Sequence, residues 1–305
     1  MGSGCDVPMT DGVSDAPVTT LVERRVRLAH PERVDPAWNP SHPELAYAAD
    51  AVSLILPYGE PYIVRTTRRA VPELEASGRA DLASDARALA TQEARHHAEH
   101  RRFNDRMVVV QPRLARVERW MARSYGWLER TRSPEFSRAF AAASETIAFS
   151  IARWADQHDD DVFDGVEPAT AALFRWHLAE EVEHKSVAHD VWAALGGGRI
   201  RYAAAAFVTF SLLAWFTVVT ILTLMFHSRH GRSPACWLRL VRWAVGIAFV
   251  TIPNLVVSVL PGHHPSDLSD PPGLVLWLRY FDPATGTVPL LEPGAVPVVD
   301  HSPPH

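Results

Sequence analysis

The chain has 305 residues, of which 47% are hydrophobic and 21% charged, so it can bury a large core and is not a wholly disordered protein. Its formal net charge of −5 gives no reason to expect a nucleic-acid partner. It contains only two cysteines, Cys5 and Cys236, which excludes a disulfide framework and a thiolate metal site. Any metal ion must therefore be held by His, Asp and Glu, and the 15 histidines are many for this length.

The chain opens with two segments that lack helical periodicity. Residues 1–20 are small, polar and acidic, without the apolar segment of a signal peptide, and we expect a disordered lead in the cytoplasm. Residues 21–45 are rich in proline and are expected to be extended. An apolar helix over 46–56 follows, and Pro57 is predicted to begin a second helix that carries Glu60.

The next segments up to residue 200 are predicted to be helical, because none shows the alternation of a strand. The helices cover residues 79–110, 113–130, 134–157 and 167–195. The acidic run from Asp156 to Asp164 is predicted to be a loop, and three consecutive glycines end the last helix. Residues 21–199 are thus expected to form one all-α domain, a helical bundle.

The region that follows is strongly apolar. Residues 202–226 contain no charge, and a second uncharged stretch over 243–262 is interrupted by Pro253. We interpret residues 200–262 as a hydrophobic helical hairpin and 263–305 as a proline-rich tail.

The hairpin admits three placements. A full span would put the arginine-rich loop between its two arms on the far side of the membrane, against the positive-inside tendency. A hairpin dipping into one leaflet would keep these arginines at the inner face of the membrane. In the third placement, both helices are buried against the bundle or at an oligomer contact, such as that of a homodimer. We expect membrane association of one kind or another.

Two helical segments carry the pattern Glu-x-x-His, as Glu93 with His96 and as Glu181 with His184. Residues three apart share a helix face, so each pair can bind one ion. The stripes are wider than these pairs: 93, 96, 97 and 100 are Glu, His, His and His, and 177, 180, 181 and 184 are His, Glu, Glu and His. Such offsets normally hold Leu or Ile, and ionisable groups there are costly unless they are paired or bind metal.

Two lone glutamates on apolar helices complete a recognisable set. Glu60 precedes the first motif, and Glu145 lies between the two motifs. One Glu from each of two helices and Glu-x-x-His from each of two others is the ferritin-like pattern of a carboxylate-bridged di-metal core. We therefore predict two Fe or Mn ions, with Zn as the alternative, held by six side chains of which the four glutamates are also catalytic: Glu60, Glu93, His96, Glu145, Glu181 and His184.

Several neighbouring residues are open to more than one interpretation. His100 and His177 are candidates for an extra ligand or for a hydrogen-bond partner of a ligand, and Asp190 is expected to orient a ligating histidine. His97 is expected to lie outside the ligand set. Three other polar residues near the second motif are expected to be solvated or paired with each other: Glu180, Glu183 and Lys185.

These segments resemble a bacterial family described as predicted metal-dependent hydrolases. The similarity rests on Leu56-Pro57-Tyr58-Gly59-Glu60, on the two motifs with their flanks Gln92–His100 and Trp176–Lys185, and on Pro261-Gly262-His263-His264-Pro265. It covers about residues 22–280, with one departure, since the family usually has Glu-His where this chain has Glu145-Thr146.

Three functions fit these observations. The ferritin-like ligand pattern favours a di-iron oxidase or oxygenase that uses O₂ on a small apolar, lipid-like substrate, with electrons from an external donor because no flavin or nicotinamide fingerprint is present. The alternative is a hydrolase in which two ions activate water, as the family resemblance implies. The third is a metal-binding, membrane-anchored protein without catalysis.

Overall fold

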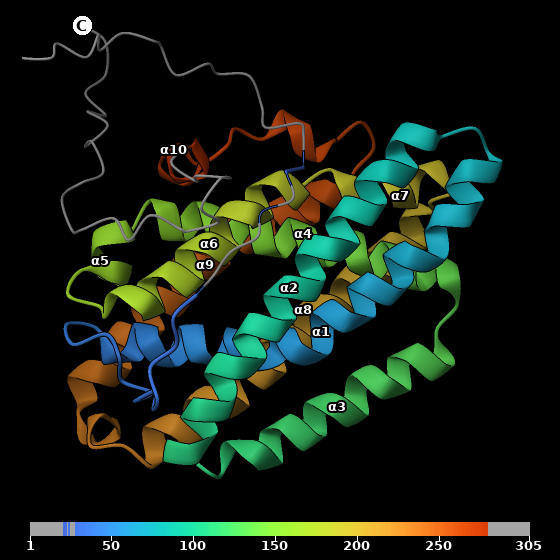
Figure 1. Ribbon diagram of the computed structural model, residues 1–305. Coiled ribbons are helices and arrows are strands. Elements are labelled where there is room, and N and C mark those ends of the chain that lie inside the picture. Colours follow the sequence, from blue (N-terminus) through green and yellow to red (C-terminus); the bar gives the residue numbers. More distant parts are fainter. Residues whose placement is uncertain (1–20, 23, 25–27, 280–305) are drawn as a thin grey trace, which may run out of the picture.

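The computed structural model describes residues 21, 22, 24 and 28–279 of the chain, and within these it is an all-α bundle without a strand (Figure 1). The predicted all-α class is therefore confirmed. The expected disordered lead over 1–20 and the last part of the expected tail lie outside the described residues.

The first two helices form a long hairpin. Helix α1 spans Pro43–Ala76 and α2 spans Ala80–Val110, and they pack along much of their length (Figure 1). Gly78 lies between them with a φ of 76°, a conformation that glycine adopts without steric cost.

The predicted helix break at Pro57 is wrong. Helix α1 continues through Pro57, Pro61 and Pro72 without interruption. A proline in a helix removes one backbone hydrogen bond, and packing of the buried face of α1 against its neighbours outweighs that loss. Glu60 thus lies in the middle of a 34-residue helix.

The central helices largely match the predicted segments. Helix α3 spans Leu114–Thr131 and α4 spans Pro134–Asp156, where the Ser133 side chain accepts a hydrogen bond from the Phe136 amide. The acidic loop predicted over 156–164 contains a short helix instead, α5 at Asp159–Phe163. Its first turn consists of three aspartates, which the helix dipole favours.

The helix predicted over 167–195 is two helices. Helix α6 spans Pro168–His184 and α7 spans Val187–Ala194, with a turn at Lys185 and Ser186. The second Glu-x-x-His motif therefore occupies the last turn of α6.

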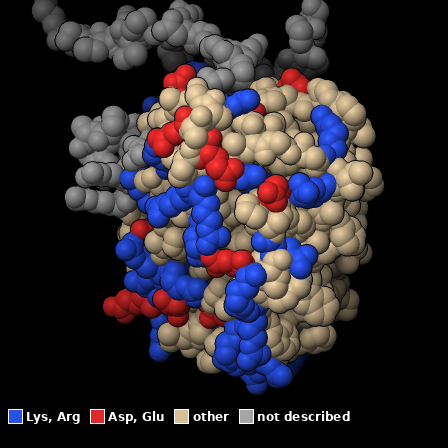
Figure 2. Space-filling view, turned by 90° about the vertical axis from the view of Figure 1, so that its right-hand side faces the viewer, with Lys and Arg blue, Asp and Glu red and all other residues tan. Residues whose placement is uncertain are grey.

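The two apolar helices are longer than predicted. Helix α8 spans Arg199–Phe226, and α9 spans Pro234–Val259 and continues through Pro253. Both pack by one face against α1 and α4, and both are long and apolar enough to cross a membrane by length and composition. Figure 2 shows a face of the molecule on which charged side chains crowd one half and leave the other half mostly uncharged.

The segment after α9 is more ordered than the predicted tail. A 3-10 turn at Pro265–Asp267 is followed by helix α10, Pro272–Arg279, whose Leu274 and Trp277 join the main core. That core is continuous from α1 to α10, so α8 and α9 share it with the helices that carry the two motifs.

Candidate metal centre

The predicted ligands come together in the middle of the bundle. Four helices each contribute: α1 gives one residue, α2 two, α4 one and α6 two. None of these residues is more than 4% exposed: Glu60, Glu93, His96, Glu145, Glu181 and His184.

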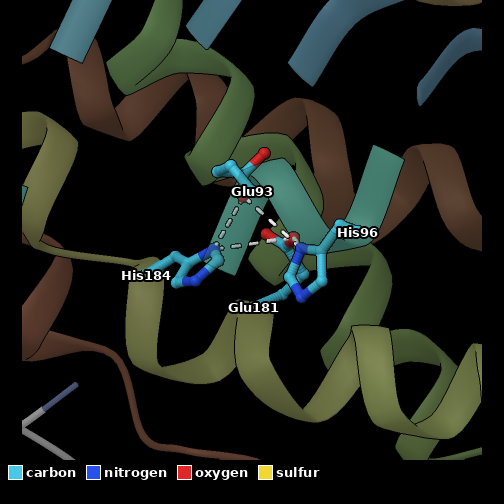
Figure 3. A group of neighbouring side chains, drawn as sticks. All are labelled: Glu93, His96, Glu181 and His184. Carbon is cyan, nitrogen blue, oxygen red and sulfur yellow. Dashed lines mark ion pairs between the residues drawn. The ribbon is translucent and has the colours of Figure 1, made fainter. Parts of the chain in front are cut away.

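One candidate ion position lies beside His184 (Figure 3). Its Nδ1 atom is 3.0 Å from Glu93 Oε1 and 3.6 Å from Glu181 Oε1. It also lies 3.5 Å from Glu145 Oε2. Four donor residues from three helices thus surround this point. Carboxylate oxygens and imidazole nitrogens suit Fe, Mn or Zn.

A second candidate position lies beside His96. Its Nδ1 atom is 3.6 Å from Glu93 Oε1 and 3.6 Å from Glu181 Oε1. Glu60, His96 and His177 also offer ligand atoms that lie within 4.8 Å of one another. Glu93 and Glu181 each lie within 3.6 Å of both His96 and His184, so both carboxylates face the two positions (Figure 3).

The donor atoms of the centre are buried and unsatisfied. Both Glu60 carboxylate oxygens are buried and make no hydrogen bond. The same is true of one oxygen or nitrogen atom, of the kind that binds metal, in each of the other five predicted ligands. Buried polar atoms without partners are rare in folded proteins because each is costly. Their convergence on shared points fits a group that supplies several bonds at once, as metal ions do.

The outward nitrogens of the two motif histidines are held by other residues. His96 Nε2 lies 2.9 Å from Glu180 Oε2, and His184 Nε2 lies 3.1 Å from Gln92 Oε1. A proton on Nε2 that is donated to these oxygens leaves the lone pair on Nδ1, facing the centre. Such contacts typically orient a ligating imidazole.

Glu180 and Glu183 are buried, contrary to the expectation that they are solvated. Glu180 contacts His96. Arg24 lies between the two glutamates, and its Nη2 atom is 2.8 Å from Glu183 Oε1. Glu183 also accepts a hydrogen bond from Gln92. Glu180 belongs to the same stripe as the ligands of α6, and that periodicity is the signal that could have identified it.

The structure also places the other histidines and the aspartate that the sequence singled out. His177 and His100 lie inside the cluster, with His177 Nε2 2.9 Å from Glu181 Oε1 and His177 Nδ1 2.8 Å from His100 Nε2. Asp190 does not contact a predicted ligand, because it pairs with His264 at 2.7 Å and lies 3.5 Å from His189. Half-buried His97 bonds the Glu93 backbone carbonyl.

Lys185 pairs with neither glutamate. The single lysine of the chain is 2% exposed, and its amine donates to the Leu268 carbonyl and to Asp270. This contact fastens the segment before α10 to the end of α6.

Burial shapes the protonation of the centre. Burial and the Glu93 carboxylate raise the pKa of Glu60 well above its usual range, and the same two causes raise the pKa of Glu145. Burial opposes a charge on His96, but its hydrogen bond to Glu180 and the nearby Glu93 carboxylate raise its pKa to about 10. A raised pKa means that each of these ligand atoms holds its proton more firmly, and a bound ion must displace that proton.

Comparison with known families supports the metal interpretation. The family model described as "Predicted metal-dependent hydrolase" matches residues 22–269. The chain belongs to this family. It matches no curated protein and no solved structure.

In this member of the predicted metal-dependent hydrolases, two adjoining cavities reach the centre. A cavity of about 120 Å³ is lined by Glu60, Glu93, Glu145 and Glu181. A larger one of about 320 Å³ lies between the bundle and the helices α8 and α9, and its walls are almost entirely apolar. Both are lined by His177 and Leu178, so the two spaces meet beside the candidate ion positions.

One residue in the wall of the smaller cavity was not identified from the sequence. Tyr125 of α3 lines the smaller cavity, and burial together with the nearby Glu60 raises the pKa of its hydroxyl. The backbone of α1 packs closely against the Tyr125 hydroxyl at Gly59, since a Cβ atom there would lie 3.3 Å from Tyr125 Oη. Tyr125 lies on a strongly amphipathic helix, where an inward tyrosine is hard to tell from ordinary core packing.

Proposed function

We propose that this protein is a two-metal enzyme whose active centre is the buried carboxylate and histidine cluster, and whose substrate is apolar or amphiphilic. The observation that carries the proposal is the set of unsatisfied donor atoms on all six predicted ligands. Four carboxylates would balance the charge of two divalent ions, so a loaded centre could be buried without a net charge.

Hydrolysis is the reaction that we place first, in line with the family description. Two ions held by these residues would lower the pKa of a water molecule and stabilise the leaving oxygen of an ester. The chain's own residues would orient the reaction: Glu93 and Glu181 face both positions, and the Tyr125 hydroxyl, in the wall of the smaller cavity, would donate a hydrogen bond to the substrate carbonyl. The apolar cavity would hold the hydrocarbon part of the substrate.

Oxidation by O₂ is the second candidate, and the donor set favours it. The chain supplies the ferritin-like order of one Glu, Glu-x-x-His, one Glu and Glu-x-x-His along four helices. Carboxylates and imidazoles without thiolate suit iron, and the larger cavity accepts a hydrocarbon that has no bond to hydrolyse. This reaction would need an external electron donor.

We also propose that the enzyme works at the inner face of a membrane. Helices α8 and α9 wall the larger cavity and expose apolar side chains on their other faces, including Phe207, Trp215 and Phe249. A lipid-like substrate could therefore pass from the bilayer to the centre without crossing water.

Metal analysis tests the proposal directly. Purified wild type is expected to carry about two ions per chain, and Glu93→Ala and Glu181→Ala are each expected to lose both, because each side chain faces both positions. A matched control is Glu99→Ala, a partly exposed glutamate of α2 that pairs with His30 and Arg102. Equal metal in the wild type and both ligand variants would overturn the assignment.

Turnover then separates the reaction classes. Cleavage of long-chain esters without O₂ or reductant supports hydrolysis, whereas O₂ consumption by the reduced iron protein with a hydrocarbon substrate supports oxidation. Bound metal without turnover in either assay would indicate a protein that binds metal but does not catalyse.

A further inference from the structure

A line of buried polar contacts leads from the second ion position into helices α1 and α2. His177 Nδ1 lies 2.8 Å from His100 Nε2, and His100 Nδ1 lies 2.8 Å from the Ser53 hydroxyl. That hydroxyl donates to Asn104 Oδ1 at 2.7 Å. All four residues are less than 9% exposed, so the line is shielded from water.

A proline fixes the far end of this line. Pro57 has no N–H, so it cannot donate to the Ser53 carbonyl four residues earlier in α1. Asn104 Nδ2 donates to that carbonyl instead, at 2.7 Å. A carbonyl oxygen only accepts, so the amide nitrogen of Asn104 must face it and Oδ1 must face the Ser53 hydroxyl.

The direction of each remaining hydrogen bond follows from this orientation. Asn104 Oδ1 accepts the Ser53 proton, so Ser53 Oγ must accept from His100 Nδ1–H. A neutral His100 then offers a lone pair on Nε2, which accepts from His177 Nδ1–H. A neutral His177 therefore carries its lone pair on Nε2.

Hydrogen bonds that ran in the reverse direction would leave a buried oxygen of Asn104 without a donor. If Ser53 donated to His100 instead, Asn104 Oδ1 would lose its donor, 2.7 Å from another oxygen, in a buried site. Turning the Asn104 amide to compensate would place its oxygen against the Ser53 carbonyl.

The Nε2 atom of His177 points at the centre. It lies 2.9 Å from Glu181 Oε1 and 3.7 Å from Glu60 Oε1. In the loaded centre, where both carboxyl groups are ionised, a lone pair that faces them is repelled unless a cation lies among them. Glu60, His96 and His177 offer ligand atoms close enough to share one ion.

We propose that His177 is a metal ligand through Nε2, at the position that it shares with Glu60 and His96. The line through His100, Ser53 and Asn104 holds it in the required tautomer. The centre is then asymmetric, with two imidazoles on the ion beside His96 and one on the ion beside His184. This inference rests on the proposed two-ion centre and assigns a seventh ligand to it.

Nuclear magnetic resonance of the intact protein tests the tautomer. The full chain, labelled with ¹⁵N in its histidines and loaded with Zn²⁺, is expected to show His177 protonated at Nδ1 and bound to metal at Nε2. The resonance is assigned by its loss in His177→Gln. A proton on Nε2 of His177 in the Zn²⁺-loaded protein would overturn the proposal.

Metal binding by variants supplies a second measurement. His177→Gln is expected to retain the ion beside His184 and to bind the other at least 10-fold more weakly, and Ser53→Ala to weaken the same ion about 10-fold. Ser150→Ala is the control, because Ser150 is equally buried in α4 but bonds only Thr146 and Asn254. Circular dichroism checks that each variant is folded.

The result separates this inference from the proposed function. If His177→Gln binds two Zn²⁺ ions as tightly as wild type while Glu93→Ala binds none, the two-ion centre stands and His177 is not a ligand. If Glu93→Ala also binds two ions, both are wrong.

Discussion

At the scale of single residues, protons and metal ions compete for the same buried atoms. Interaction with Glu180 and Glu93 raises the pKa of His96 to about 10, and burial raises the pKa of Glu60 and Glu145. Without ions His96 holds a proton at neutral pH, and the Glu60 and Glu145 carboxyls keep theirs to a higher pH than a solvated carboxyl does. Binding of two ions must therefore release protons, and the site is coupled to pH.

We expect the apparent affinity for Zn²⁺ to rise from pH 6 to pH 9. Each proton released contributes roughly a tenfold increase per pH unit, and the increase continues towards the His96 pKa of about 10. Isothermal titration calorimetry in buffers of different ionisation enthalpy measures the number of protons released. An affinity that does not change over this range would show that the donors are already deprotonated.

The metal-free protein should show the opposite trend in stability. A raised pKa of His96 in the folded state stabilises the fold below the unfolded value of 6.5, and this contribution is lost as pH rises through about 10. We expect the free energy of unfolding of the metal-free protein, measured with urea, to fall between pH 7 and 10. The free energy of unfolding of the Zn²⁺-loaded protein should fall less over this range, because a bound ion replaces the proton on His96. Equal losses in both forms would argue against His96 as a ligand.

Glu180 should matter to metal binding although it is not a predicted ligand. Its Oε2 holds His96 Nε2 at 2.9 Å and so directs Nδ1 at the centre. We expect Glu180→Gln to weaken Zn²⁺ binding about 10-fold, the lower end of what loss of such a contact costs. Glu183→Gln is the matched control, on the same helix and in contact with the same Arg24. If both variants bind alike, orientation of His96 does not depend on Glu180.

At the scale of elements, the sequence was informative where local pattern and tertiary packing agree. Helix α2 was predicted within one residue because it has neither Gly nor Pro inside and begins and ends at clear breaks. The ligand stripes were found because polar residues at core offsets are conspicuous. The same logic was not applied to Glu180, which lies within the stripe of α6 but was expected to be solvated because it is not part of a Glu-x-x-His pair.

Proline was the main source of error. Pro57 and Pro253 both lie inside helices, because tertiary packing overrides a local preference. In α1, moreover, the Ser53 carbonyl that Pro57 leaves without a helical hydrogen bond accepts one from the Asn104 side chain instead. Such a partner 51 residues away cannot be read from local sequence, whereas the two motifs are local and can.

The junction of α6 and α7 should depend on Lys185. Its amine is buried and bonds Asp270 and the Leu268 carbonyl. We expect Lys185→Ala to lower the free energy of unfolding by about 3 kcal/mol, since removal of one partner leaves buried polar groups uncompensated. Chemical denaturation measures this, and hydrogen exchange should increase first in α10.

A surface pair provides the comparison for this effect. Arg175 bonds Asp159, which is 42% exposed, so Arg175→Ala should cost less than about 1 kcal/mol. A similar loss in the two variants would mean that burial does not set the value of the Lys185 contact.

At the scale of the whole molecule, the bundle is covered on one side by α8 and α9. In their most apolar segments only 33% and 17% of residues are buried inside the protein. Large apolar side chains therefore face outwards, and Phe207 and Phe249 are 73% and 76% exposed. Exposed apolar patches of this kind in a folded protein mark an interaction surface.

We expect this surface to bind lipid. Burial of one phenylalanine in a bilayer contributes about 2 kcal/mol, so Phe249→Glu should lower the fraction of protein bound to anionic phospholipid vesicles at least about tenfold in partition coefficient. Flotation of vesicles through a density gradient measures it. Metal content should not change, because Phe249 does not line either cavity at the centre.

A control variant and extraction of the vesicles with alkaline carbonate distinguish binding to one leaflet, a full span of the bilayer and a contact between protein copies. Trp127→Glu changes an aromatic residue that is 50% exposed on α3, and it should float like wild type. Protein that leaves the vesicles in alkaline carbonate lies in one leaflet, whereas protein that stays crosses the bilayer. If Phe249→Glu floats as well as wild type, the outer faces of α8 and α9 do not bind lipid, and a contact between two copies of the chain would be the better account of their apolar surface.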